Sequence, residues 1–510
     1  MKKFLEEWRW TIVAGLGIFL LALGIRIYNL TILPVFVDEA IYIRWAQVMG
    51  AEPTLRFLPL SDGKQPLFMW ILMFYVRRLA DPLFAGRILS VASGIGTMLG
   101  IFAVSYLLFR NKFVSLFSTI LYALSPITLF FDRLALVDSL LAMLGIWILF
   151  FGILTAKRRR LDLAMITGFL LGAALLTKSP AIFFVLLLPA AGIFLKKPKD
   201  LLKLGLLLLV TYGIGYAMYN ILRLGPNFNL ISSRNRDYVL PFSHLWTNFR
   251  DPFIPHLKDV FLKWLPKIGP WPVLMLIAIG LLTTARKHWR EIIFLGSWFI
   301  IPILIQSEFA KVFTARYILF TLPPLFIIAG AVFTAPRVVL AKWGWVFIIL
   351  FAITSLKFDY LLLTDPARAD LPRSERSGYL EEWTAGDGIR EIADFLKHQS
   401  LAINHQKIVV GTEGYFGTLP DGLQMYLNEN PEIVVIGVGI SIKEIPVGLL
   451  ASKKAGNPTF LVVNKSRLGT DPDKLGLTLL AAYPKALRPP GDREFFLKGP
   501  QEILYFFELK

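Results

Sequence analysis

The residues of this sequence that could do chemistry are charged side chains beside or inside apolar runs. The acidic pair Asp38-Glu39 follows the first long apolar run, and Asp138 lies within a later one. An ionisable residue inside a membrane span is costly enough to indicate a functional site. The alternatives are a solvated boundary for the acidic pair and, for Asp138, a buried ion pair with Arg133 or Lys178.

Three cations accompany these carboxylates. Lys64 precedes the apolar segment 66–76, Lys178 lies at a hinge between two short apolar runs, and Arg316 opens another run. The alternative for Lys64 is ordinary snorkelling of a long side chain toward the membrane surface. For Lys178 and Arg316, the alternative is that each cation only marks a helix end.

Together, these charges would suit an amphiphilic substrate whose anionic head lies at the membrane surface. Cations hold a phosphate, and a carboxylate takes a proton from an acceptor hydroxyl. Transfer of a group from a phosphate-linked lipid needs both a carboxylate base and cations, because the charge that develops on the departing phosphate needs fixed positive groups. Asp38, Glu39 and Asp138 could instead hold one divalent cation. We favour a site without metal or any other cofactor.

The composition of the chain indicates that these residues are positioned by a membrane protein. The chain has 510 residues, of which 55% are hydrophobic and 18% charged. Soluble domains average about 25% charged residues, so a soluble globular enzyme is excluded. A formal charge of +18 would suggest nucleic acid in a soluble protein. In a membrane protein it reflects basic cytoplasmic loops, and we expect no nucleic-acid partner. With no cysteine in the chain, disulfides and thiol chemistry are excluded.

The apolar runs predict a polytopic α-helical membrane protein with about eleven transmembrane helices. The runs cover 11–25, 84–108, 113–131, 134–155, 162–177, 179–195, 204–222, 271–284, 291–306, 316–334 and 343–361. Basic clusters such as 157–160 all fall in loops on one side, and the opposite short turns hold few charges, which places the clusters and the N-terminus in the cytoplasm. We therefore predict a multi-pass protein of the cell membrane (inner or plasma membrane), with its active site and C-terminus on the extracytoplasmic side.

Three longer segments share the predicted outer face: 29–83, 225–270 and 362–510. Within the first, 66–76 is apolar but too short to cross the bilayer, so we predict an interfacial or re-entrant helix. The sequence thus divides into a transmembrane catalytic domain, 1–361, and a soluble extracytoplasmic domain, 362–510.

The tail changes character from the rest of the chain. Short β-branched runs at 407–411, 432–438 and 459–463 predict strands. A helix is predicted at 387–399, with further helices at 421–427 and 441–450 and a last strand at 503–509. These elements predict a small α/β domain.

The order of the charged motifs along the chain resembles that of a known family. Asp-Glu-Ala is followed in order by Lys-x-Pro-Leu, Arg-(x)4-Asp, Leu-Thr-Lys-x-Pro and Arg-Tyr-(x)5-Pro. This order resembles the membrane glycosyltransferases of the GT-C fold, in the branch of protein O-mannosyltransferases and the lipid A aminoarabinose transferase. The resemblance covers about residues 10–360.

The resemblance implies a polyprenyl-phosphate-linked monosaccharide donor and an inverting single displacement by an acceptor hydroxyl. It implies Asp38 as the base, with Glu39 and Asp138 as further catalytic carboxylates. Lys64 and Arg316 match positions near the donor phosphate, and Lys178 is a further candidate there. The sugar and the acceptor, whether protein, lipid or glycan, stay open.

Some positions depart from the family pattern. The usual Lys-Pro-Pro reads Lys64-Gln65-Pro66, and the usual Lys-Gly-Pro reads Lys178-Ser179-Pro180. Aminoarabinose transferases often carry a basic residue three after the Asp, where this chain has Ile41. That difference argues against lipid A modification. The junction 379–386 resembles one in bacterial members whose last span precedes a small α/β domain.

The main alternative is a transporter or flippase of a lipid-linked substrate, since ionisable residues in spans are common there too. Transporters place them near the midplane and carry inverted repeats. Here the charges cluster at one predicted face and no repeat is visible. A lipid phosphatase or ligase is a weaker alternative, because the phosphate-binding motifs of those enzymes are absent from the sequence. The tail could itself be the functional module, although eleven spans exceed what an anchor needs.

Overall fold

The computed structural model describes residues 2–334 and 340–510. The chain forms two compact units. The first comprises Met1–Leu30, Thr54–Ile71 and Arg87–Pro372, and the second comprises Thr31–Pro53, Leu72–Gly86 and Arg373–Lys510. The tail therefore packs with two pieces of the first predicted loop, a feature that nothing in the sequence pattern indicated.

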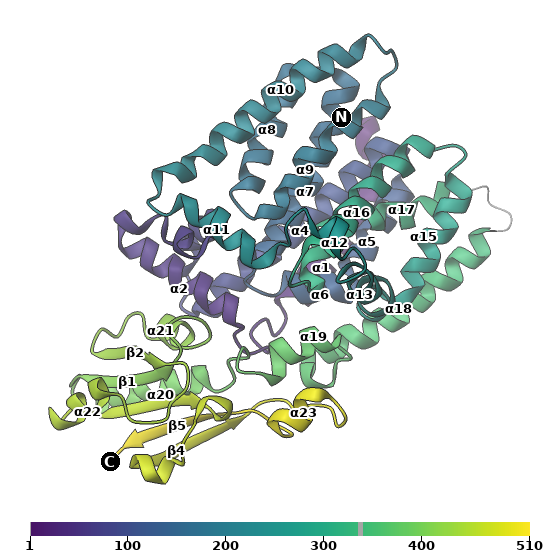
Figure 1. Ribbon diagram of the computed structural model, residues 1–510. Coiled ribbons are helices and arrows are strands. Elements are labelled where there is room, and N and C mark those ends of the chain that lie inside the picture. The colour runs from purple at the N-terminus through teal and green to yellow at the C-terminus, as the bar shows by residue number, and fades with distance from the viewer. Residues whose placement is uncertain (1, 335–339) are drawn as a thin grey trace. The chain divides into compact units, whose positions relative to one another are not determined.

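The first unit is helical (Figure 1). Seven helical segments of the described residues are long and apolar enough to cross a membrane: Glu6–Ile27, Pro82–Phe109, Val137–Arg158, Asp200–Leu224, Trp289–Phe309, Ala315–Thr334 and Gly344–Thr364. In the same order, they overlap helices α1 (Lys2–Ile27), α4 (Pro82–Phe109), α7 (Val137–Arg158), α10 (Asp200–Tyr219), α16 (Trp289–Phe309), α17 (Leu322–Gly330) and α18 (Leu340–Thr364).

Two further spans are bent pairs. Helix α5 (Lys112–Ala123) meets α6 (Pro126–Asp132) at 62°, and Phe253–Lys267 meets α15 (Trp271–Thr284) at 105°. The first bend falls at Pro126, which has no N–H to continue the helical ladder. Counting each pair as one span raises the number of membrane-length segments from seven to nine.

The other apolar helices are shorter. They are α3 (Leu67–Val76), α8 (Leu161–Leu175) and Ser179–Phe194, which contains α9 (Ile182–Leu187). The last two match the predicted runs 162–177 and 179–195, so all eleven predicted runs contain helix in the described residues. Helix α3 confirms the short helix predicted at 66–76. Its interfacial depth and the membrane orientation stay predictions.

The segment 225–270, which was predicted to lie on the outer face, contains α11 (Phe228–Tyr238), α12 (His244–Thr247) and the continuous helical stretch Phe253–Lys267. That stretch comprises α13 (Phe253–Lys258), a π-helical turn (Asp259–Trp264) and α14 (Leu265–Lys267). Two histidine side chains of this segment contact the end of α16. The His244 ring nitrogen lies 3.1 Å from a Glu308 carboxylate oxygen, and the His256 ring lies 3.0 Å from the Ser307 carbonyl.

The second unit contains a five-stranded sheet in the order β2-β1-β3-β5-β4 (Figure 1). The strands are β1 (Ile408–Glu413), β2 (Ile433–Gly439), β3 (Thr459–Asn464), β4 (Leu477–Pro484) and β5 (Ile503–Leu509). Strands β2 and β3 pair with β1 in parallel, whereas β5 runs antiparallel to β3 and β4 antiparallel to β5. The helices are α2 (Val37–Ala51), α19 (Arg373–Arg376), α20 (Ile389–Ala402), α21 (Asp421–Tyr426), α22 (Val447–Lys454) and α23 (Arg493–Lys498).

The sheet confirms the predicted α/β tail. Strands β1, β2, β3 and β5 lie where β-branched and aromatic runs predicted them. Leu449 of α22 is buried with Val409 and Leu461 in one apolar cluster on the sheet. Strand β4 was missed because its sequence, LTLLAAYP, is rich in leucine and alanine, which favour helices. Its antiparallel pairing with β5 overrides that local preference.

Candidate functional site

The acidic pair lies in the first turn of α2, in the second unit. Asp38 is half-buried and Glu39 is fully buried. The Phe36 backbone N–H donates to Glu39 Oε2 at 3.0 Å. Glu39 thus caps the start of the helix, and both carboxylates benefit from the positive end of the helix dipole. The two neighbours therefore have different surroundings, and Glu39 has a structural contact that the sequence did not reveal.

In the first unit, Asp138 forms an ion pair with Lys178. The Lys178 Nζ lies 2.6 Å from Asp138 Oδ1, and the Asp138 side chain is 4% exposed. The same Nζ lies 4.3 Å from the centre of the Tyr317 ring. Arg316 also lies over that ring, with its Cζ 5.3 Å from the centre. Lys178, which pairs with Asp138, and Arg316 thus both lie over the ring of one tyrosine.

The third cation, Lys64, lies in a second charged group of the first unit. Its Nζ is 3.3 Å from an Asp62 carboxylate oxygen. The guanidinium of Arg234, on α11, lies 2.6 Å from the other Asp62 oxygen. Gly63 separates Asp62 from Lys64 and has a φ of +67°. A Cβ there would meet the Arg234 side chain at 2.7 Å, so the turn that presents Lys64 requires glycine.

The segments that hold Lys64 and Lys178 are directly connected. Gln65 Nε2 donates to Ser179 Oγ at 2.9 Å, and the Leu67 backbone N–H donates to the Leu176 carbonyl at 3.0 Å. The two residues that depart from the family pattern, Gln65 and Ser179, are therefore partners in one hydrogen bond.

Gln65 and Ser179 line a cavity of about 1160 Å³ in the first unit. Leucine, isoleucine and tyrosine side chains form much of its wall, including Tyr212, Tyr216 and Tyr219. Its polar lining also includes Asn235, Arg236 and Lys311. A large apolar space with a few polar groups is typical of a ligand site. Arg236 and Lys311 could not be recognised as site residues from the sequence, because exposed basic residues are common.

Arg133, the first residue of the Arg-(x)4-Asp motif, and Asp132 before it both have structural partners. Asp132 pairs with Arg26 at 3.1 Å, and neither side chain is exposed. Arg133 donates to the carbonyls of Ile25, Arg26, Tyr28 and Asn29 at the end of α1. Of the two partners considered for Asp138, the structure therefore selects Lys178. A Cβ at Gly94 would lie 2.2 Å from Asp132 Oδ2, so α4 needs glycine beside this pair.

No group of three or more His, Asp or Glu side chains suited to a metal ion occurs among the described residues. This finding does not test metal dependence, and a site without metal stays a prediction. Among the residues of the predicted site, Asp38 and Glu39 belong to the second unit. The other four belong to the first.

Comparison with known proteins gives one family match. The family described as dolichyl-phosphate-mannose-protein mannosyltransferase matches residues 63–216. That range contains Lys64, Asp138 and Lys178, but neither Asp38 nor Arg316. No curated protein matches the chain significantly.

Solved structures match over most of the chain. ArnT from Cupriavidus metallidurans, in the apo state, is 14% identical with a TM-score of 0.60, over 98% of this chain and 97% of that chain. The same protein bound to undecaprenyl phosphate is 16% identical with a TM-score of 0.56, over 98% of each chain. The Archaeoglobus fulgidus oligosaccharyltransferase, tethered with an acceptor peptide, is 10% identical with a TM-score of 0.51, over 90% of this chain and 69% of that chain.

These likenesses confirm the predicted fold class, a GT-C-like helical membrane protein with a C-terminal α/β region. The match to ArnT also extends over the tail, because 98% of the chain is covered. At these identities the likeness concerns the fold. The sugar and the acceptor therefore belong to the proposal that follows.

Proposed function

We propose that this protein is a glycosyltransferase that moves a monosaccharide from a polyprenyl-phosphate donor to an acceptor hydroxyl on the outer face of the membrane. The observation that carries the proposal is the charged group at Tyr317, where Arg316 and the Asp138-paired Lys178 both lie over the ring. The match of residues 63–216 to the mannosyltransferase family supports the same class of reaction.

In the proposed reaction, Asp38 accepts the proton of the acceptor hydroxyl as its oxygen attacks C1 of the sugar. The bond between C1 and the phosphate oxygen breaks, and its electron pair leaves with the polyprenyl phosphate. A single displacement inverts C1, because a retaining route would need a second carboxylate as nucleophile. Lys64 and Arg316 stabilise the negative charge that grows on the departing phosphate.

The buried ion pair assigns a different role to Asp138. Its carboxylate holds the Lys178 ammonium against the face of Tyr317. A lysine with one carboxylate partner keeps donors for a phosphate oxygen, since an ammonium has three. We therefore propose that Asp138 orients Lys178 toward the donor phosphate. For Glu39 we propose that its cap on Phe36 fixes the first turn of α2, which carries Asp38.

The cavity supports a lipid-linked donor. Its apolar wall would accept prenyl units, and Gln65 in that wall directly follows Lys64. ArnT has been crystallised with undecaprenyl phosphate, and the proposed donor for this chain has the same chemical class. The partners in this proposal are a polyprenyl-phosphate sugar, an acceptor still to be identified, and membrane lipids.

The proposal is tested with purified protein and a panel of polyprenyl-phosphate monosaccharides, with a crude envelope extract as acceptor. Release of polyprenyl phosphate is measured by mass spectrometry. We expect release that depends on one donor and on the extract. If folded protein releases nothing from any donor but moves a labelled lipid between leaflets of a vesicle, the flippase alternative replaces this proposal.

A further inference from the structure

The segment that precedes Asp38 is held by backbone hydrogen bonds within the second unit. The Val37 N–H donates to the Thr384 carbonyl at 3.1 Å, and the Gly386 N–H donates to the Val35 carbonyl at 2.8 Å. Phe36 and Ala385 form an antiparallel bridge between these bonds. The backbone position of Asp38, one residue after Val37, is therefore set by the turn 382–386.

Helix α2 has further anchors in the same unit. Arg44 donates to Asn428 Oδ1 at 2.7 Å, and Gln47 donates to the Met425 carbonyl at 2.9 Å. These contacts fix the middle of α2 beside the end of α21. The turn 382–386 contacts α2 at its start, where it bonds the backbone of Val35 and Val37 directly before Asp38.

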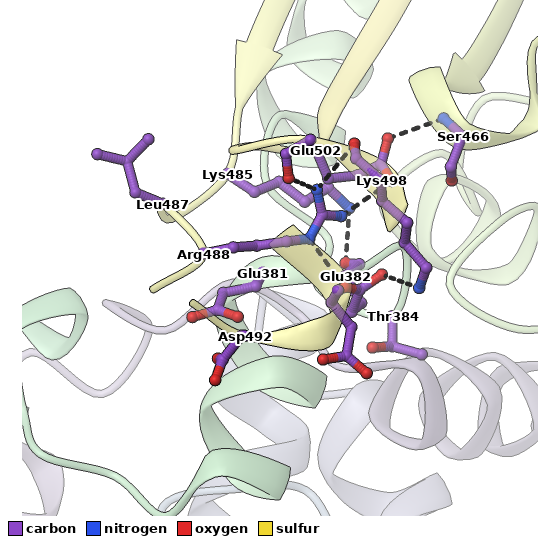
Figure 2. A network of polar contacts seen from close by, with 12 residues as sticks. Glu381, Glu382, Thr384, Ser466, Lys485, Leu487, Arg488, Asp492, Lys498 and Glu502 are labelled. Atoms are coloured by element: carbon purple, nitrogen blue, oxygen red, sulfur yellow. Dashed lines mark hydrogen bonds and ion pairs between the residues drawn. The ribbon is translucent and has the colours of Figure 1, made fainter. Parts of the chain in front are cut away.

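The turn 382–386 is also held by three cations, of which Lys485 and Arg488 are buried and Lys498 is exposed (Figure 2). Lys485 is buried, with 3% of its surface exposed. Its ammonium donates to the Glu382 carbonyl at 3.1 Å and to the Ala385 carbonyl. The Glu382 carboxylate accepts from Arg488 at 3.0 Å and from Lys498 at 2.8 Å. Both the backbone and the side chain of the turn are thus tied to the segment after β4.

Arg488 extends this network to the segment just before β5. It lies 3.4 Å from Glu502 and donates to the Gly499 carbonyl at 3.1 Å. Glu502 in turn accepts from the Ser466 N–H at 2.9 Å. Burying charges in this way costs free energy unless every partner is satisfied, and such networks are poor sources of net stability. A role in fixing geometry accounts better for its presence.

The contact between the turn and Val35 leaves no room for a side chain. A Cβ on Gly386 would lie 2.7 Å from the Val35 carbonyl oxygen and 2.5 Å from a Val35 methyl. This clash explains the glycine at the end of the 379–386 junction motif. It also supplies a substitution that disturbs the contact without changing any charge.

We propose that Lys485 and Arg488 are positioning residues for Asp38, and that the C-terminal α/β domain places the base of the reaction. This inference rests on the proposed function, which assigns the base to Asp38. The ammonium of Lys485 fixes the carbonyls of Glu382 and Ala385. The turn between them then fixes Val37, and Val37 fixes the first turn of α2.

The test is Lys485→Met in the full chain, which keeps the length of the side chain and removes its donors. We expect kcat to fall by about 100-fold, the cost of a displacement of about 1 Å in a reacting group, while the donor KM changes less than twofold. Hydrogen exchange should show faster exchange at the Val37 amide, with the β1 amides unchanged. Lys397→Met, which removes a partly exposed lysine of α20 paired with Asp394, is the control and should keep wild-type kcat.

A second variant keeps the test decisive if Lys485→Met does not fold. Gly386→Ala leaves every charge in place and forces the turn away from Val35, so we expect the same fall in kcat and the same local exchange. Wild-type kcat in a folded Lys485→Met or Gly386→Ala protein would overturn the inference. Equal loss of protection at Val37 and throughout β1 would overturn it as well, because it would indicate general unfolding.

A double variant separates this inference from the proposed function. If Asp38→Asn alone retains wild-type turnover, the base assignment itself fails. If Asp38→Asn abolishes turnover and both positioning variants retain it, only the present inference fails. In the Asp38→Asn background, Lys485→Met should cause no further loss of the residual rate, because it acts through the missing carboxylate.

Discussion

The side chains of Gln65 and Ser179 form a hydrogen bond in which Gln65 Nε2 donates to Ser179 Oγ across 2.9 Å. Each residue directly follows a lysine of a proposed donor site, Lys64 or Lys178. At these two positions the family pattern has proline and glycine, neither of which could form this bond through a side chain. The two departures therefore form one structural feature.

We expect the Gln65–Ser179 pair to couple the two lysine segments. Ser179→Ala and Gln65→Leu should each lower the free energy of unfolding by about 1 kcal/mol. The double variant should lose less than the sum of the two. Thermal unfolding of the four proteins in detergent, arranged as a double-mutant cycle, measures this coupling. Ser297→Ala, which removes a bond within one turn of α16, is the control; strict additivity at 65 and 179 would contradict the coupling.

The buried ion pair of Asp138 and Lys178 should respond asymmetrically to substitution. Lys178→Met leaves the Asp138 carboxylate buried and unpaired, so we expect destabilisation by about 3 kcal/mol and loss of transfer. Adding Asp138→Asn to Lys178→Met should restore most of the stability but not the activity. Thermal unfolding and donor turnover, measured on the same preparations, separate the two effects. Recovery of turnover in the double variant would show that Lys178 has no part in binding the donor.

The cations assigned to the donor phosphate should affect donor binding and turnover. Lys64→Gln should raise the donor KM and lower kcat/KM by about 10–100-fold, since a charge-assisted hydrogen bond contributes about 1.5–3 kcal/mol. Arg316→Gln should behave in the same way. The initial rate is measured against the concentration of the identified donor for each variant, and wild type and Lys397→Gln serve as references. Unchanged kcat/KM for both Lys64→Gln and Arg316→Gln would remove these residues from the donor site.

Asp387, in the second unit, should make stability depend on pH. Burial raises the pKa of its carboxyl to about 6 from 3.8, against the opposing charge of Lys485. Because the folded state then holds a proton that the unfolded state releases, stability falls as pH rises from about 4 to about 6. The contribution is about 3 kcal/mol. Asp387→Asn should flatten this decline in a series of denaturation curves across that pH range, and an unchanged decline would place its origin in another group.

The sequence predicted those parts of the molecule that depend on local patterns. Apolar runs indicated the helices of the first unit, and β-branched runs indicated strands β1, β2 and β3. The ion pair of Asp138 with Lys178 was one of two alternatives, because both Arg133 and Lys178 lay at suitable ends of apolar runs. Only the fold could show that Arg133 is engaged by carbonyls at the end of α1.

The packing of α2 against the C-terminal part of the second unit could not be predicted. Val37 and Thr384 are separated by more than 300 residues, and their bond is between backbone groups that carry no sequence signal. The 379–386 motif did hint at a special junction. Its glycine gains a physical meaning only when Val35 is seen against it. Similarly, the sequence shows Tyr317 only as the neighbour of Arg316, whereas the structure places the Lys178 ammonium over its ring.

The measurement that tests the account most directly compares wild type with Asp38→Asn on the donor identified in the panel. Release of polyprenyl phosphate is followed under single-turnover conditions, with binding of the donor measured separately. The account predicts that Asp38→Asn binds the donor normally and releases polyprenyl phosphate at least about 100-fold more slowly, as expected for loss of a general base. Release at the wild-type rate by folded Asp38→Asn protein would contradict the assignment of Asp38 as the base.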